Sequence, residues 1–289
     1  MKELTIPAYA KINLTLDVLG KRPDGYHDLS MVMQSVSLAD QVIIRETGEE
    51  GFTLKTDLGF LPGADKNIAG VAARAFARHT GADLSGLEIE LQKHIPVCAG
   101  TAGGSSDGAA VLRGLNRWFS CGLSLRHLAE IGEEVGSDVP YCVLGCTALA
   151  EGRGEKLTCL PALPDCHIVL CKPGFSVSTP ELFRKLDQVS LRRHPDTAGI
   201  VSALERSNLG DICRRMYNVF EDVNDRRMRT VTAIKNVLID HGALGAVMTG
   251  TGSAVFGIFT DKAAAEAARD ELKKDYGFCC LAGGVRALT

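Results

Sequence analysis

The stretch Lys93-His-Ile-Pro-Val-Cys-Ala-Gly-Thr-Ala-Gly-Gly-Ser-Ser-Asp-Gly-Ala-Ala110 is the most informative part of this sequence. A strand ends just before it, a run of small residues then turns, and we expect a helix to start at Ser105 or Ser106. Small residues let the backbone approach a ligand closely, and the unpaired N–H groups of a helix N-terminus favour anions. The stretch therefore predicts a cradle for phosphate oxygens, in which both serine hydroxyls can contact phosphate or bound Mg²⁺.

The spacing of the glycines in this stretch excludes two common phosphate-binding motifs. No Gly-Lys-Ser/Thr follows them, as a Walker A loop requires, and they lack the Gly-x-Gly-x-x-Gly spacing of a dinucleotide site. A capped helix after a loose turn explains the stretch almost as well. Whether this stretch binds phosphate therefore has to be decided from other segments of the chain.

Patterns of strands and helices mix without strict alternation on both sides of the loop. Ile12, Leu14 and Leu16 alternate with polar residues and predict a half-buried strand, in which all three face one way. Further strands are predicted at 31–38, 40–45, 87–91, 167–171, 246–259 (two strands around a glycine loop) and 279–285, and helices at 67–79, 125–135 and 263–276. This mixture predicts an α+β chain in two lobes, residues 1–160 and 161–289.

Composition limits the class of protein. The chain has 289 residues, of which 45% are apolar and 23% charged, as in soluble globular proteins. A net charge of −3 argues against a nucleic-acid partner, and no apolar run reaches the roughly 18 residues of a membrane-spanning helix. The ten scattered cysteines and the absence of an apolar leader predict reduced thiols in a cytoplasmic protein.

Four other features are candidate site residues, and each has a plain structural explanation. Asp138 stands where a capping or turn aspartate is common. Lys11 is a lone charge in an apolar strand, and its head could reach back to water. The glycine-rich turn 248–253 could be a tight hairpin, and Tyr26 with His27 could stack a flat ring or belong to the surface.

Taken together, the segments point to one family. Pro7 to Leu14, the loop at 96–110 and Met248-Thr-Gly-Thr-Gly-Ser253 resemble the three signature segments of the GHMP kinases. Three further blocks resemble those members that phosphorylate a cytidine diphosphate-linked polyol: 22–29, 136–141 and 147–155. The resemblance implies an ATP-dependent kinase with an alcohol acceptor. It also implies an N-terminal ATP-binding lobe like ribosomal protein S5 domain 2, with a ferredoxin-like C-terminal lobe completing the substrate cleft.

The resemblance also implies roles for single residues. Asp138 would take the proton of the substrate hydroxyl, and Lys11 beside it would favour the ionised carboxylate and the developing alkoxide. Tyr26 and His27 would hold the cytosine, with Phe183 closing the other face. The remaining implied substrate contacts are Asn13 near the reacting end, Gly250 and Thr251.

ATP and Mg²⁺ are the implied cofactors, and the metal ligands remain open. The residues implied to contact ATP are Asn67, Lys93, Pro96, Val97, Cys98, Ala99, Gly100, Thr101, Ala102, Gly103, Gly104, Ser105 and Ser106. Asn67 and Lys93 would lie nearer the nucleoside. The partner would be a small molecule, with neither nucleic acid nor membrane, and the protein would be a monomer or a homodimer.

The loop departs from the family's usual pattern at three positions. Cys98 and Ala102 stand where the family has glycine, and Thr101 stands where it has leucine. A side chain at a glycine position with positive φ often costs about 1–2 kcal/mol of strain. Two alternatives therefore stay open: another GHMP kinase with a different alcohol substrate, or a non-catalytic nucleotide or metabolite sensor on the same fold.

Overall fold

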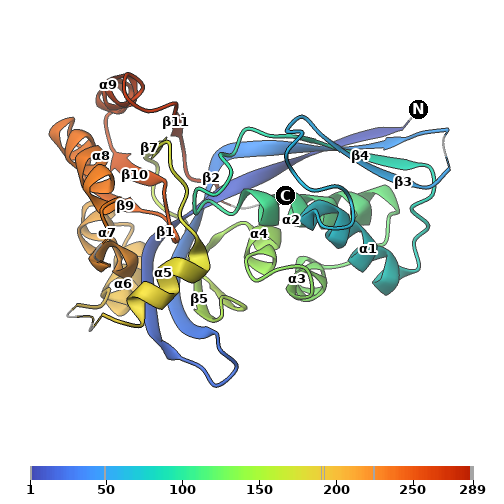
Figure 1. Ribbon diagram of the computed structural model, residues 1–289, viewed down its shortest axis with the longest axis horizontal. Helices are drawn as coiled ribbons and strands as arrows, with labels where there is room; N and C mark the ends of the chain where they lie inside the picture. Colours follow the sequence, from blue (N-terminus) through green and yellow to red (C-terminus); the bar gives the residue numbers. More distant parts are fainter. Residues whose placement is uncertain (1, 49, 190, 192, 224, 287–289) are drawn as a thin grey trace.

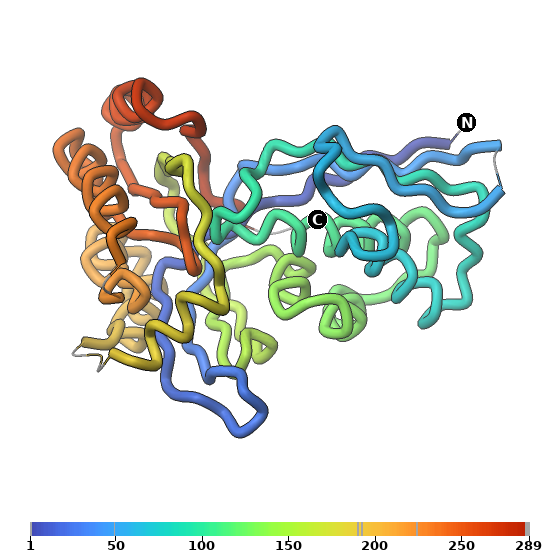
Figure 2. The backbone as a smooth tube through the Cα atoms, viewed as in Figure 1, coloured from blue at the N-terminus to red at the C-terminus, as the bar shows by residue number. Residues whose placement is uncertain are grey.

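Two β-sheets, each covered by helices, make up the computed structural model (Figures 1 and 2). The structure describes residues 2–286 except 49, 190, 192 and 224. The first sheet has the order β3-β4-β2-β1-β8, with β5 paired to β2 and β6 paired to β5. Its strands are β1 (Glu3–Lys21), β2 (His27–Glu46), β3 (Phe52–Thr56), β4 (Leu87–Gln92), β5 (Thr147–Gly152), β6 (Lys156–Cys159) and β8 (Tyr217–Asn218).

The second sheet is antiparallel and has the order β11-β7-β10-β9. Its strands are β7 (His167–Lys172), β9 (Gly245–Met248), β10 (Val255–Phe259) and β11 (Phe278–Ala282). Helices α8 (Met228–Asp240) and α9 (Lys262–Leu272) pack on it. The remaining elements of this half are α5 (Thr179–Leu186), α6 (Thr197–Glu205), α7 (Leu209–Arg215) and the 3-10 turn η1 (Val219–Asp222).

The helices of the first half are α1 (Ile68–Thr80), α2 (Gly103–Trp118), α3 (Leu125–Glu133) and α4 (Val139–Leu144). Of these, α2 contacts both β1 and β2 and also packs against the other three helices. Figure 1 shows these four helices in one half of the molecule and α5–α9 in the other, with the long β1–β2 hairpin running between them. No helix in the described part of the chain is long and apolar enough to cross a membrane.

Residues 10–18 of strand β1 are buried on both faces, so the prediction of a half-buried strand is wrong for this segment. Ile12 and Leu14 pack in one apolar cluster, whereas Leu16 packs in the other. The pairing of β1 with β2 shifts register between Asn13 and Thr15. This irregularity turns the following residues over, because side chains alternate strictly along a regular strand.

Two predicted boundaries also change. Residues 31–38 and 40–45 belong to one continuous strand, β2. Helix α2 begins at Gly103, before the predicted start at Ser105 or Ser106. A side chain at Gly103 would lie 3.0 Å from the Ile95 side chain, so glycine here lets the first turn pack directly on the loop.

Candidate active site

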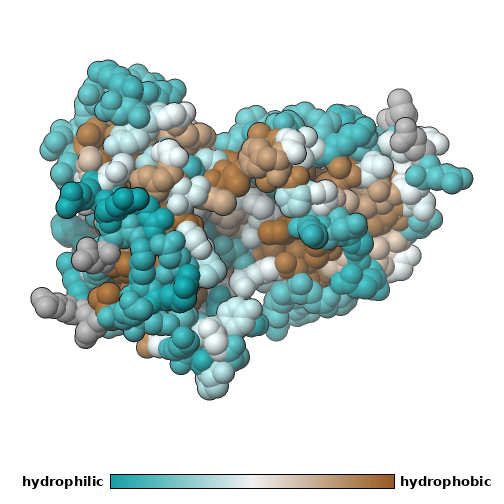
Figure 3. All heavy atoms as spheres, in the orientation of Figure 1, coloured by the Kyte–Doolittle hydropathy of each residue, from teal (hydrophilic) through white to brown (hydrophobic). Residues whose placement is uncertain are grey.

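A cavity of about 1090 Å³ opens between the two halves of the molecule. Its walls come from the loop before α2, the first turns of α2, the tip of the β1–β2 hairpin, α5 and the loop after β9. Figure 3 shows apolar side chains gathered near the middle of one face, where the two halves meet. All site residues predicted from the sequence line the cavity except Asn13 and Ser106.

Lys11 and Asp138 meet in this cavity. The Lys11 side chain is 6% exposed, so its head does not reach back to bulk water. Its Nζ donates to Asn13 Oδ1 at 2.7 Å and lies 4.0 Å from Asp138 Oδ2. Asp138 occupies the N-cap position of α4, but its side chain makes no capping bond. The plain structural explanations of both residues are therefore wrong.

Asn13 is fully buried and connects Lys11 to the second half of the chain. Its backbone N–H donates to Thr249 Oγ1 at 3.0 Å, and the Thr249 hydroxyl lies 3.3 Å from both Asn13 Oδ1 and the carbonyl of Gly100. The predicted contact of Asn13 with substrate stays a prediction. In this structure the Asn13 side chain accepts a hydrogen bond from the Lys11 ammonium. Thr249 was missed from the sequence, where it appears only as one hydroxyl in a glycine-rich turn.

The loop before α2 is built on left-handed backbone. Cys98 has φ 54° and Ala102 has φ 58°, so both departures from the family's glycines carry conformational strain. The glycine-rich turn after β9 packs directly against this loop. A Cβ at Gly250 would lie 2.8 Å from the Gly100 carbonyl, and the Ala254 N–H donates to the Ala99 carbonyl at 3.1 Å. The turn is therefore more than a hairpin, because it holds the loop in place.

The start of α2 leaves its first N–H groups open. Ala102 occupies the N-cap position and has no side-chain oxygen with which to cap them. Ser105 lines the cavity. Ser106, in contrast, is buried, and its hydroxyl donates to the Tyr9 carbonyl at 2.6 Å. The Ser106 hydroxyl therefore does not face the cavity as predicted, and the contact of the Ser105 hydroxyl with phosphate stays a prediction.

A buried ionic cluster lies beside the loop. The Lys93 ammonium is bonded to both Asp40 and Asp107. The pKa of Asp107 is raised to about 7, because burial and the Asp40 carboxylate, which raise it, outweigh the Lys93 ammonium, which lowers it. Burial alone would lower the pKa of Lys93, but the two carboxylates together raise it. The contact of Lys93 with the nucleoside stays a prediction. The positive charge of Lys93 is already compensated by the two carboxylates. Asp40 and Asp107 were missed from the sequence.

Asn67 stands at the start of α1 on the same side of the cavity. Its Oδ1 accepts from the Ala69 N–H at 3.0 Å, and its Nδ2 donates to the Pro62 carbonyl at 3.3 Å. The side chain therefore already serves as a helix cap. Its contact with ATP also stays a prediction.

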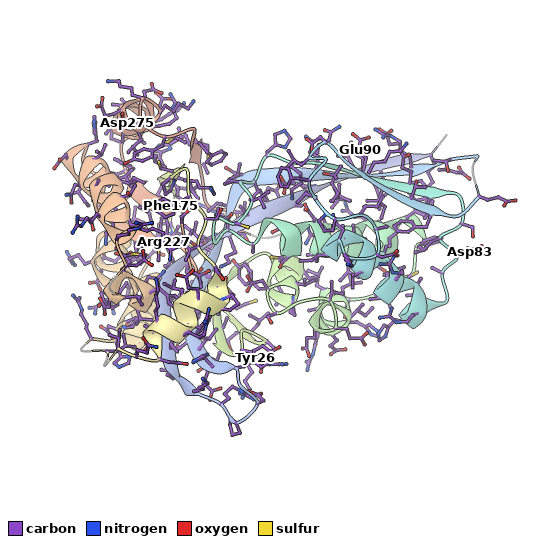
Figure 4. The ribbon with its side chains drawn as sticks, in the orientation of Figure 1. Tyr26, Asp83, Glu90, Phe175, Arg227 and Asp275 are labelled. Carbon is purple, nitrogen blue, oxygen red and sulfur yellow. The ribbon has the colours of Figure 1, made fainter. Side chains whose placement is uncertain are left out.

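Aromatic rings mark the other end of the cavity. Tyr26 is 55% exposed, and Figure 4 shows it near α5 and the β5–β6 hairpin. The Arg153 guanidinium lies 5.2 Å from the centre of its ring. His27 stacks on Phe183 at 4.6 Å, and its Nε2 lies 2.7 Å from Asp187 Oδ1. A base cannot fit between two rings this close, so the predicted closure of Phe183 over the far face of a base held by His27 is not possible in this arrangement, and the contact of Tyr26 with cytosine stays a prediction.

Two family profiles match the chain. Residues 67–146 match the GHMP kinases N terminal domain, and residues 200–277 match the GHMP kinases C terminal domain. A 4-diphosphocytidyl-2-C-methyl-D-erythritol kinase from Lachnospira eligens is 45% identical over 262 residues, 91% of each chain. Another, from Geobacillus thermodenitrificans, is 43% identical over 286 residues, 99% of this chain and 97% of the relative.

Solved structures agree with these matches. A crystal structure of 4-(cytidine 5'-diphospho)-2C-methyl-D-erythritol kinase has a TM-score of 0.82 and 29% identity, covering 97% of this chain and 99% of the other. Homoserine kinase from Cytophaga hutchinsonii has a TM-score of 0.78 at 20% identity, covering 99% and 96%, and so shares the fold. The predicted α+β fold of the GHMP kinase type is confirmed.

Proposed function

Since this chain belongs to the GHMP kinase family, and within it to the 4-diphosphocytidyl-2-C-methyl-D-erythritol kinases, we propose that it phosphorylates the 2-hydroxyl of that compound with ATP. The reaction is a step of the non-mevalonate route to isoprenoids. One observation carries the proposal for the site. The Lys11 ammonium and the Asp138 carboxylate lie close together in a cavity. One wall of this cavity is the glycine-rich loop before α2, and another carries aromatic rings.

In the proposed mechanism, Asp138 accepts the proton of the 2-hydroxyl as the oxygen attacks the γ-phosphorus of ATP. The buried ammonium of Lys11 stabilises the negative charge that develops on this oxygen. A positioned base contributes roughly 10²–10⁴-fold to such a reaction. Asn13 orients the ammonium, since its Oδ1 accepts from Lys11 Nζ at 2.7 Å. The geometry supports these roles because Asp138 lines the cavity and is not used as a helix cap.

The ATP phosphates are proposed to bind at the start of α2. The open N–H groups of the first turn and the positive end of a 16-residue helix both favour phosphate oxygens. The loop from Pro96 to Ser105 lines the cavity throughout. Asn67 and Lys93 border the same side, which supports their placement near the nucleoside.

Magnesium is part of the proposal as a companion of ATP. Among the described residues, no group of three or more His, Cys, Asp or Glu side chains could hold a metal ion. Mg²⁺ often binds through one or two carboxylates together with the phosphates of a substrate. Ser105 lines the cavity, and its hydroxyl oxygen would complete such a shell around the phosphates, whereas Asp138 is reserved for the substrate proton. When bound, the ion neutralises charge on the β- and γ-phosphates.

The cytidine end is proposed to bind at the aromatic end of the cavity. Tyr26 offers an exposed ring for stacking, and His27 and Phe183 form the adjoining wall. Gly250 and Thr251 line the cavity from the second half of the chain. We retain the division into residues 1–160 and 161–289, a boundary that falls between β6 and β7. We also propose a cytoplasmic location and a monomer or homodimer without nucleic-acid or membrane partners.

Release of ADP from ATP, with and without the cytidine diphosphate substrate, tests the function. We expect release that depends on this substrate. ADP release that responds to homoserine or mevalonate instead would indicate another alcohol. A protein that binds ATP and the substrate but releases no ADP would be the nucleotide sensor. The meeting of Lys11 with Asp138 argues against the sensor, because nucleotide binding alone needs neither group.

A further inference from the structure

Cys146 and Cys159 bring their sulfur atoms to 3.0 Å from each other. Cys146 comes directly before β5, and Cys159 is the last residue of β6. The two strands form an antiparallel hairpin in which Ala148 faces Cys159. A disulfide bond is about 2.05 Å long, so the sulfurs need to approach by only roughly 1 Å. We propose that this pair is a modification site, at which a low-molecular-weight disulfide reversibly oxidises the folded enzyme to a Cys146–Cys159 disulfide.

The two thiols differ in access, which sets the order of reaction. Cys159 is exposed, whereas Cys146 is half-buried. Burial and, to a smaller extent, the neighbouring Cys159 together raise the pKa of Cys146 to about 12. Cys146 is therefore protonated at neutral pH. Strand β6 pairs only with β5 among the described strands, so one edge of the hairpin faces outward. Cys159 is consequently the thiol that meets the oxidant.

The chemistry needs one oxidant molecule, such as glutathione disulfide. The Cys159 thiolate attacks one of its sulfurs, which forms a mixed disulfide and releases one glutathione thiolate. Cys146 then loses its proton to solvent, and its sulfur attacks Cys159 Sγ. The second glutathione leaves, so two protein thiols are oxidised and one small disulfide is reduced. We expect the second step to be the slower one, because little of Cys146 is ionised.

The other cysteines provide internal comparisons. Cys171 and Cys279 face each other across β7 and β11, but both are buried and closed to an oxidant. Cys98 and Cys121 are exposed, and the structure records no sulfur partner for either within the residues that it describes. They can accept glutathione but have no second thiol with which to expel it.

The proposed disulfide protects the exposed thiol. A lone exposed cysteine can proceed to sulfinic and sulfonic acids, which are not readily reversed, whereas a disulfide returns to thiols on reduction. The same hairpin carries Arg153, which lines the cavity. Because the sulfurs already lie close together, bond formation should leave Arg153 in place. We therefore expect the oxidised enzyme to keep its turnover. The inference does not depend on which alcohol the enzyme phosphorylates.

Incubation of the folded full-length protein with glutathione disulfide, followed by peptide mapping without reduction, tests the site. We expect a Cys146–Cys159 crosslink that dithiothreitol removes, and a higher melting temperature while it is present. Cys146→Ser should stop at a glutathione adduct on Cys159, and Cys159→Ser should leave Cys146 unmodified. Cys146→Ala is the second variant if the serine at this half-buried position impairs folding.

Three results would overturn the inference. The first is a stable glutathione adduct on Cys159 in the parent, with Cys146 still free. The second is a crosslink that maps to Cys171 and Cys279. The third is a Cys146→Ala variant that resolves its adduct as the parent does.

Discussion

Lys11 Nζ lies 4.0 Å from Asp138 Oδ2, although one residue comes from the middle of β1 and the other from the start of α4. The separation exceeds a hydrogen bond, while Asn13 Oδ1 holds the ammonium at 2.7 Å. The cation is therefore fixed by an amide and leaves the carboxylate oxygen facing the cavity. This arrangement suits a base that must accept a proton from a substrate hydroxyl.

Asp138→Asn keeps the size of the side chain and removes the base. We expect kcat to fall at least about 10²-fold, because general-base catalysis contributes roughly that much or more. The melting temperature should change little, since the side chain makes no capping bond. Steady-state kinetics together with thermal melts separate the two effects. Turnover within a few-fold of the parent would remove Asp138 from this role.

Thr249→Val tests whether the turn after β9 positions the catalytic lysine. The change keeps the shape but removes the hydroxyl that accepts from the Asn13 N–H at 3.0 Å. An unpaired buried donor costs about 1–3 kcal/mol, so Asn13 should lose its fixed orientation. We expect kcat to fall about tenfold, with little change in the affinity for a non-hydrolysable ATP analogue. Thr249→Ser should restore kcat. Equal loss in both variants would indicate packing alone.

Ala102→Gly should relieve the left-handed strain at the start of α2. Because Ala102 has φ 58°, we expect unfolding to cost about 1 kcal/mol more in the variant. ATP-analogue binding should be unchanged or tighter, since the change restores the family's residue. Ala99→Gly in the same loop is the matched control. The φ of Ala99 is not positive, so Ala99→Gly should not increase the free energy of unfolding. A less stable Ala102→Gly variant would contradict this account of the loop.

Asp107 predicts a pH dependence of stability. Burial raises its pKa to about 7, so the folded state holds a proton that the unfolded chain loses near pH 4. Stability should therefore fall as pH rises from about 4 through 7. Asp107→Asn should remove this loss, gaining on the parent by at least about 1 kcal/mol between pH 5 and pH 8. The exposed Asp275→Asn is the control. Denaturant unfolding at both pH values measures the difference, and parallel profiles for Asp107→Asn and the parent would refute the assignment.

Tyr26→Ala tests the cytidine end. Stacking of a base on an aromatic ring is worth about 1–3 kcal/mol, so the KM for the cytidine diphosphate substrate should rise by roughly tenfold or more. The KM for ATP should stay the same. Phe60→Ala is a suitable control, because Phe60 is 73% exposed and does not line the cavity. An unchanged KM for the cytidine diphosphate substrate would mean that Tyr26 is an exposed residue that does not bind the substrate.

The sequence predicted about half of the helices and strands, and nearly all of the site residues that it predicted line the cavity, because strand periodicity and glycine-rich turns are local signals. Prediction from the sequence failed where contacts between residues far apart in the chain determine the local structure. The register shift at Asn13 depends on the pairing of β1 with β2, which turns Leu16 away from Leu14. The engagement of Ser106 depends on a carbonyl at Tyr9. No local pattern marks either one.

Two buried aspartates were missed for the same reason. Asp40 lies in β2 and Asp107 in α2, and only the fold brings both to Lys93. In sequence each resembles an ordinary exposed carboxylate. The strain at Cys98 and Ala102 was foreseen as a possibility, and the positive φ at both positions decides it.

Phosphorus NMR of the reaction mixture tests the central claim most directly. The account predicts that one equivalent of ATP becomes ADP while a phosphomonoester appears on the 2-oxygen of 4-diphosphocytidyl-2-C-methyl-D-erythritol, whose diphosphate stays intact. Both signals should be nearly absent with Asp138→Asn. ADP that accumulates with inorganic phosphate and no monoester, or a monoester formed equally well by Asp138→Asn, would contradict it.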